Sequence, residues 1–243
     1  MTTHSASRKS ARAHGRIASV LAYDGAVATT LLKAFQFFVL SVSFVAGIAP
    51  AIVFSLLVGW QNTHLAIWLG AASVLTIVPA AYGALAAAQR ELLVPGGSRA
   101  GREFWHSFAF AFRRLWWLAA SAVALTLVLA YDFAITGGDD AALLAMAAAA
   151  IAAALLTVGA CCVAIDTGCT SAVDLIVSTV RSIARRPHIA LSWGMLIALG
   201  MVSITIPVIG TAATLFAPAV VAAAIVICNT TLGFAREPEE PRS

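Results

Sequence analysis

Charged side chains are scarce in this chain. Asp, Glu, Lys and Arg make up 11% of its 243 residues, whereas hydrophobic residues make up 61%. Ordinary globular proteins carry roughly 25% charged residues, which keep the exposed apolar patches on their surfaces small. A soluble domain of this length could not hide so much apolar surface. Composition therefore excludes a soluble globular protein and predicts an integral membrane protein.

The chain also lacks the motifs that carry metal, nucleotide or nucleophilic chemistry. None of its four cysteines stands in a CxxC or His/Cys spacing, and adjacent Cys161 and Cys162 point to different faces of a helix. The glycine pair at 96–97 lacks the GxxxxGK[ST] pattern of a phosphate-binding loop. The histidines are scattered over different loops, so no Ser-His-Asp triad can be argued. These absences predict no metal, no cofactor and no enzymatic activity.

Six long apolar runs follow one another, at about 34–60, 65–88, 115–131, 141–165, 189–208 and 212–234. Most reach the roughly 20 residues that a helix needs to cross about 30 Å of hydrocarbon. A barrel would need short alternating strands, whereas these runs are continuous. The prediction is an all-α, polytopic helical bundle with about six transmembrane helices. Within it, the Ala-rich segment 141–154 predicts close helix packing.

The central portions of the six apolar runs contain no Asp, Glu, Lys, Arg or His. This absence argues against a proton-coupled transporter with its own buried carboxylate. Pro50, Pro79 and Pro218 interrupt the first, second and sixth runs. A broken helix can free backbone groups for a binding site, although kinks without ligands are more common. Pro79 is the strongest functional candidate of the three.

The basic residues predict the orientation, because Lys and Arg in short flanking loops favour the cytoplasmic side. With six spans and a cytoplasmic amino terminus, the inner segments hold every Lys and Arg of the chain: Arg8, Lys9, Arg12, Arg16, Lys33, Arg90, Arg99, Arg102, Arg113, Arg114, Arg181, Arg185, Arg186, Arg236 and Arg242. The net charge of +4 is thus explained by topology, and no nucleic-acid partner is expected. Both termini are predicted to be cytoplasmic.

Three regions follow from these patterns. Residues 1–30 form a basic, largely disordered cytoplasmic tail that leads into the first helix. Residues 31–235 form the transmembrane helical domain, and residues 236–243 form a short polar cytoplasmic tail. The Ser/Ala/Arg-rich start also fits an organellar transit peptide, which is the less favoured alternative.

Two of the predicted inner loops carry an amphipathic helix that we expect to lie along the membrane surface. In the first, Phe104, Phe108, Phe112 and Leu115 recur at helical spacing with Trp105 beside them. In the second, the apolar face consists of Val173, Ile176, Val177, Val180, Ile183 and Ala184. The residues expected to contact lipid headgroups or a partner are Arg102, Trp105, Arg113, Arg114, Arg181, Arg185 and Arg186. Each helix ends in an arginine pair before the next span, which indicates either an internal duplication or convergent use of interfacial anchors.

The segment Thr76-Ile77-Val78-Pro79-Ala80-Ala81-Tyr82-Gly83-Ala84-Leu85, followed by Phe104-Trp105-His106-Ser107-Phe108 and the first arginine pair, resembles the YesL-like family of bacterial membrane proteins. The layout is similar over roughly residues 37–234, and the motifs are similar only around these segments. Val78 stands where the family usually has a glycine, and the first span and outer loop are longer. The resemblance implies a bacterial cytoplasmic-membrane protein of no established activity, associated with carbohydrate uptake or utilisation.

Three functional hypotheses result. The favoured one is a non-enzymatic accessory protein whose basic, aromatic surface helices dock membrane transporter subunits, a second copy of the chain or anionic lipid headgroups. The second is a small-solute transporter. The third is a lipid-processing enzyme at the inner surface, which would have to use Glu103, His106, Asp166 or Asp174.

Overall fold

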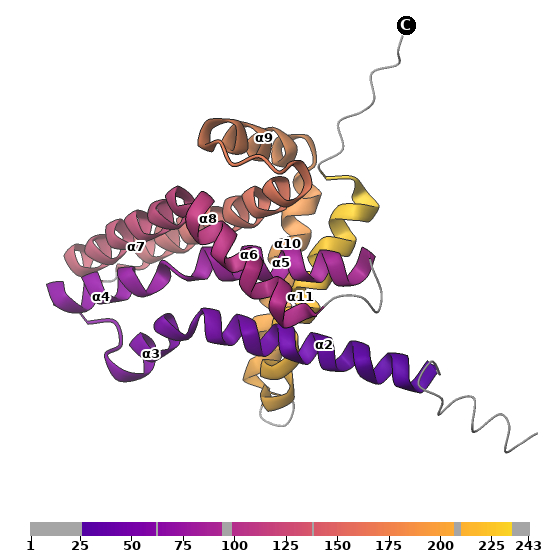
Figure 1. Ribbon diagram of the computed structural model, residues 1–243. Helices are drawn as coiled ribbons and strands as arrows, with labels where there is room; N and C mark the ends of the chain where they lie inside the picture. The colour runs from indigo at the N-terminus through magenta and orange to yellow at the C-terminus, as the bar shows by residue number, and fades with distance from the viewer. Residues whose placement is uncertain (1–25, 62, 94–98, 138, 207–209, 235–243) are drawn as a thin grey trace, which may run out of the picture.

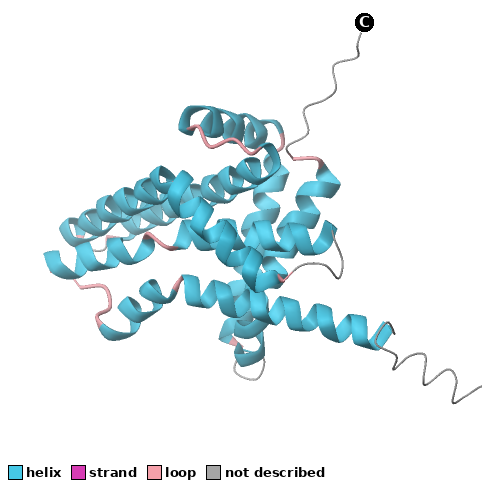
Figure 2. Cartoon of the chain, viewed as in Figure 1, coloured by secondary structure: helices cyan, strands magenta, loops and turns pink. Residues whose placement is uncertain are grey.

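A computed structural model describes residues 26–61, 63–93, 99–137, 139–206 and 210–234 of the chain. The described residues form helices joined by short loops and contain no strand (Figures 1 and 2). The helices are α2 (Ala26–Gly47), α3 (Ala49–Leu57), α4 (His64–Val74), α5 (Ile77–Leu93), α6 (Ala100–Arg114), α7 (Trp116–Thr136), α8 (Asp140–Thr167), α9 (Ala172–Arg185), α10 (Pro187–Thr205) and α11 (Gly210–Leu232). This architecture confirms the predicted all-α fold.

Several of these helices are long and apolar enough to cross a membrane. In the described part of the chain five segments meet that requirement: Val27–Gly47, His64–Leu93, Trp116–Thr136, Asp140–Thr167 and Thr214–Leu232. The fifth predicted run corresponds to α10, whose apolar part, Pro187–Ser203, is shorter. Figure 1 shows α10 and α11 running at a steep angle to α2, α5, α7 and α8.

The first predicted run, 34–60, is wrong as a single span. The helix α2 begins earlier, at Ala26, and ends at Gly47, and the separate short helix α3 follows from Ala49. Pro50 lies in the first turn of α3, where a missing backbone N–H costs nothing. The start of α2 lies within the segment 1–30 that was assigned to the tail. The remainder of that tail and the segment 236–243 lie outside the described residues.

The other two prolines also have structural explanations. Pro79 is buried in the first turn of α5, just after the break between α4 and α5, so it interrupts no helical hydrogen bond inside either helix. Pro218 lies inside α11. Next to it, the backbone N–H of Ala219 donates to Ser41 Oγ of α2 at 3.1 Å, so a side chain from a neighbouring helix partners the backbone at the proline.

The helix α6 is held in the bundle by Phe104, whose side chain is fully buried between α2 and α5. A Cβ atom added at Gly47 would stand 3.2 Å from the Phe104 ring, and one added at Gly83 would stand 3.1 Å from the Phe104 carbonyl oxygen. The two glycines therefore allow α6 to approach both helices closely. Beside this contact Tyr82 stacks on Phe110 at 5.9 Å between ring centroids. The two segments that carry the family resemblance thus pack against each other.

Candidate functional site

The helix α9 presents its apolar face outward. Val173, Ile176, Val177 and Val180 are 71%, 50%, 59% and 49% exposed, whereas Leu175 is fully buried. In water an unpartnered apolar face of this kind would be unfavourable, but it suits a helix that lies in the boundary between lipid headgroups and acyl chains. In Figure 1 α9 lies on the outside of the molecule beside α8. The predicted amphipathic helix is confirmed, and its apolar face is open.

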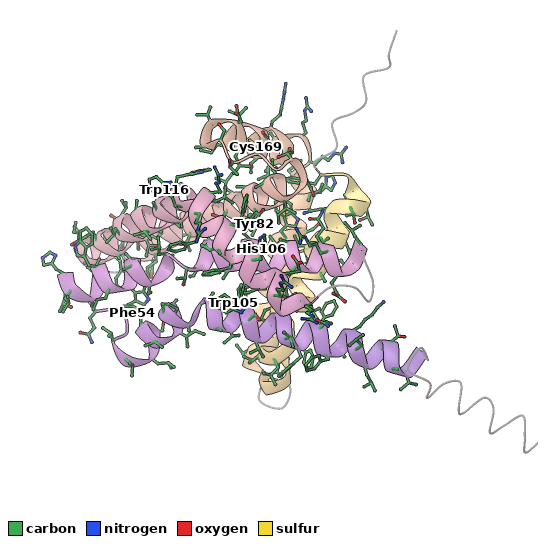
Figure 3. All side chains as sticks on the ribbon, in the orientation of Figure 1. Phe54, Tyr82, Trp105, His106, Trp116 and Cys169 are labelled. Carbon is green, nitrogen blue, oxygen red and sulfur yellow. The ribbon has the colours of Figure 1, made fainter. Side chains whose placement is uncertain are left out.

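The helix α6 differs from α9, because other helices cover part of its apolar face. Phe104 and Leu115 are fully buried, whereas Trp105 and Phe112 remain 46% and 44% exposed. Trp105 and His106 lie on α6, and Trp116 lies at the start of α7 (Figure 3). The similar sequence patterns of α6 and α9 therefore correspond to unequal environments, since the apolar face of α6 is partly packed in the bundle and that of α9 is open.

The basic residues predicted as contact sites fall into two groups. Arg102, Arg113 and Arg114 on α6 and Arg181 and Arg185 on α9 are exposed, and none has an ion pair or hydrogen bond to another described residue. Arg186 is different. Its guanidinium donates to the backbone carbonyls of Leu232 and of Gly233, the latter at 2.8 Å, so it binds the carboxyl end of α11. Arg186 is thus already engaged within the protein.

An apolar cavity of about 590 Å³, open to the outside of the molecule, lies between α5, α7, α8 and α9, and Ile176 and Val180 of the exposed face of α9 are among its lining residues. Two polar groups of its lining residues, the indole Nε1 of Trp117 and the hydroxyl of Thr179, are buried and have no hydrogen-bond partner in the described part of the chain. Sequence reasoning missed this cavity, because its walls come from separate helices whose packing the sequence pattern does not give. The one local signal was the series of alanines in α8, three of which, Ala150, Ala153 and Ala154, line it.

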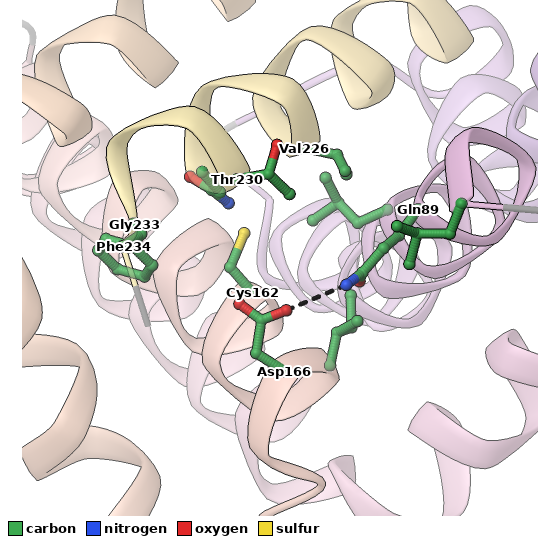
Figure 4. Close-up of a pocket in the computed structure, with 11 residues that line it drawn as sticks. Gln89, Cys162, Asp166, Val226, Thr230, Gly233 and Phe234 are labelled. Atoms are coloured by element: carbon green, nitrogen blue, oxygen red, sulfur yellow. Dashed lines mark hydrogen bonds between the residues drawn. The ribbon is translucent and has the colours of Figure 1, made fainter. Parts of the chain in front are cut away.

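A smaller, more polar cavity of about 360 Å³ lies between α5, α8 and α11 (Figure 4). In it Gln89 Nε2 donates to Asp166 Oδ1 at 3.1 Å. The thiol of Cys162 and the side chain of Asn229 also line it, and Asn229 Oδ1 accepts a hydrogen bond from Trp193 Nε1 at 2.9 Å. The polar side chains of this cavity thus largely satisfy one another.

The acidic and histidine residues of the enzyme hypothesis do not form one site with a common set of contacts. Glu103 forms an ion pair with Arg90, and Asp166 is bound to Gln89. His106 lines a separate pocket on α6, and Asp174 is exposed at the start of α9. Among the described residues no group of three or more His, Cys, Asp or Glu side chains could hold a metal ion.

The buried pair of Trp193 and Asn229 yields a stability prediction. Asn229→Ala should lower the free energy of unfolding by about 1–3 kcal/mol, because the Trp193 N–H loses its hydrogen-bond acceptor in a buried site. Thermal unfolding in a mild detergent measures the change. Thr230→Ala is the control, since Thr230 is exposed and its hydroxyl bonds only within its own helix. Equal effects of the two substitutions on the free energy of unfolding would show that the Trp193–Asn229 hydrogen bond does not stabilise the fold.

The fold and the exposed apolar helices define the class: the chain is an all-helical, multi-pass membrane protein. No protein-family model, no curated protein and no solved structure matches it.

Proposed function

We propose that the chain is a non-enzymatic protein of the bacterial cytoplasmic membrane that binds anionic phospholipid headgroups at the inner surface. The binding residues are Arg113, Arg114, Arg181 and Arg185, named here the basic patch. The observation that carries the proposal is the combination of the open apolar face of α9 with arginines that have no partner among the described residues. Both termini are cytoplasmic in this proposal, as the distribution of Lys and Arg indicates.

The strength of such binding follows from membrane electrostatics. Each Lys or Arg close to an anionic leaflet contributes about 1 kcal/mol, and the attraction falls off within a Debye length of about 8–10 Å. An arginine guanidinium also binds phosphate oxygens in a bidentate manner. The basic patch therefore favours anionic over zwitterionic lipids by an amount that salt reduces.

This binding activity is compatible with an accessory role beside a transporter in carbohydrate uptake, as the resemblance to the YesL-like family implies. A lipid-anchored surface helix would hold the protein in a fixed orientation against membrane transporter subunits or a second copy of the chain. The small-solute transporter and the lipid-processing enzyme stay alternatives. The polar cavity around Asp166 is the feature that favours the transporter most.

The test replaces all four residues of the basic patch by glutamine. Wild-type protein in nanodiscs made from equal parts of anionic phosphatidylglycerol and zwitterionic phosphatidylcholine should retain the anionic lipid with an enrichment on the order of tenfold after detergent extraction. The variant should lose that enrichment. Mass spectrometry of the retained lipids measures both.

Arg90→Gln is the matched control, because its charge is already paired with Glu103 and its loss should leave the enrichment unchanged. Equal retention of both lipids by the wild type would contradict the proposal.

A further inference from the structure

We infer that the apolar cavity between α5, α7, α8 and α9 binds one acyl chain of an anionic membrane phospholipid whose phosphate contacts the basic patch. The inference rests on the proposed function, which supplies the headgroup site, and adds a site for the chain. The shape of the cavity, its two unpaired polar groups and the arginine near the start of α7 support this site.

The cavity has the volume and lining of a lipid-chain site. Its volume of about 590 Å³ falls within the range of roughly 300–1,000 Å³ typical of small-ligand pockets. The walls are almost wholly apolar, and alanines leave the space open: Ala81, Ala122, Ala150, Ala153, Ala154 and Ala160. In a bilayer the surrounding medium is hydrocarbon, so an apolar hollow between spanning helices is filled by an acyl chain in preference to water.

The length of the cavity corresponds to one leaflet. Trp117 and Leu129 both line it from α7. They are separated by about 18 Å along the helix axis at 1.5 Å per residue. One leaflet is half of the hydrocarbon thickness of about 30 Å. An acyl chain that enters at Trp117 therefore runs along α7 to about the midplane.

The two unpaired polar groups belong to Trp117, near the start of α7, and to Thr179 on α9. Thr179 is only 2% exposed, and the Nε1 atom of Trp117 is buried although the residue as a whole is half-buried. Buried N–H and O–H groups without a partner are unfavourable and uncommon in native structures. The ester carbonyls of a glycerolipid are hydrogen-bond acceptors, and they stand between the phosphate and the chains. They would satisfy both groups.

The arginines complete the order of groups in a phospholipid. Arg114 precedes Trp117 by three residues, near the start of α7. Arg181 follows Thr179 by two residues on α9, and its side chain is exposed on a different side of that helix from the buried Thr179. At the start of α7 the apolar cavity, the unpaired N–H of Trp117 and the cation of Arg114 therefore follow one another, in the order of the acyl chain, the ester and the phosphate of a phospholipid. A free phosphate or a soluble glycerophosphate would account for the arginines but not for the cavity.

The experiment fills the cavity with a phenyl ring. Delipidated full-length wild type, Ala153→Phe and Ala152→Phe are titrated in detergent with phosphatidylglycerol that carries long chains, and native mass spectrometry measures binding. Ala153 lines the cavity, whereas its neighbour Ala152 is exposed and does not. Ala153→Phe should weaken binding at least tenfold, and Ala152→Phe should leave it unchanged.

Soluble glycerophosphoglycerol, which has the headgroup without chains, serves as a second probe. It should bind weakly and equally to all three proteins. If Ala153→Phe binds the long-chain lipid as well as the wild type does, the cavity is not the chain site. If the four-glutamine variant loses lipid selectivity in that case, the proposed function stands and only the chain site falls.

A second variant keeps the inference testable if Ala153→Phe does not fold. Thr179→Val removes the unpaired hydroxyl, so it should weaken lipid binding several-fold while the delipidated protein melts at the same or a higher temperature. Thr157→Val is the control, because Thr157 lines the same cavity but its hydroxyl already donates to Ala153 O at 2.8 Å. A lower melting temperature of Thr179→Val with unchanged lipid binding would mean that the hydroxyl is structural, and would overturn the inference.

Discussion

Phe104→Ala should lower the free energy of unfolding by about 3–5 kcal/mol, the usual cost of truncating a fully buried aromatic side chain. The ring fills the space between Gly47 of α2 and Gly83 of α5, and neither glycine has a side chain that could move into the cavity. The substitution therefore loosens the contacts of α6 with both helices. Typical proteins have a free energy of unfolding of only about 5–15 kcal/mol, so this loss is a large fraction of the total.

Phe112→Ala is the matched control on the same helix. Phe112 is 44% exposed, so the same truncation there should change the stability by less than about 1 kcal/mol. Thermal unfolding of both variants in the same detergent measures the difference. Similar effects at the two positions would show that α6 is not anchored through Phe104.

The spanning segments were predictable because their signal is local. Each consists of a long apolar run, and hydrocarbon thickness sets its minimum length. The break between α2 and α3 was less evident, because the run continues through Gly47-Ile48-Ala49-Pro50 without a polar residue. The first turn of a new helix accommodates Pro50, so the chain changes direction where hydropathy stays high.

The surroundings of the two amphipathic helices were not predictable from their patterns. Periodicity identifies an apolar face, but it does not say what covers that face. Phe104 on α6 is covered through close approaches at Gly47 and Gly83, glycines that lie in other helices. Val173 and Val177 on α9 have no such cover. The distinction arises from tertiary contacts between segments distant in sequence.

The surroundings of the Ala-rich segment 141–154 were likewise not predictable from its sequence. Small residues predicted close helix packing there, and that prediction is wrong, because none of these residues is buried. Ala150, Ala153 and Ala154 instead line the apolar cavity. Small side chains permit either a close contact or a hollow, and the position of the neighbouring helix decides between them.

The orientation of the chain in the membrane predicts an all-or-none difference in cysteine labelling between the two sides. In a variant without the four native cysteines, single cysteines replacing Gln61 and Asp139 should react with a membrane-impermeant thiol reagent on intact cells. Cysteines replacing Arg99 and Asp174 should react only after the cells are opened. All four positions are exposed in the structure, so accessibility depends on the side of the membrane rather than on burial.

The physical reason is the bias that retains Lys and Arg on the cytoplasmic side of short loops. Asp139 is separated from Arg99 by α7 and from Asp174 by α8, each long enough to cross the bilayer. Opposite labelling on the two sides of α7 and α8 is therefore the expected pattern. Labelling of Arg99→Cys or Asp174→Cys on intact cells would place the basic patch outside. There it would face the outer leaflet, and lipid binding at the inner surface would be untenable.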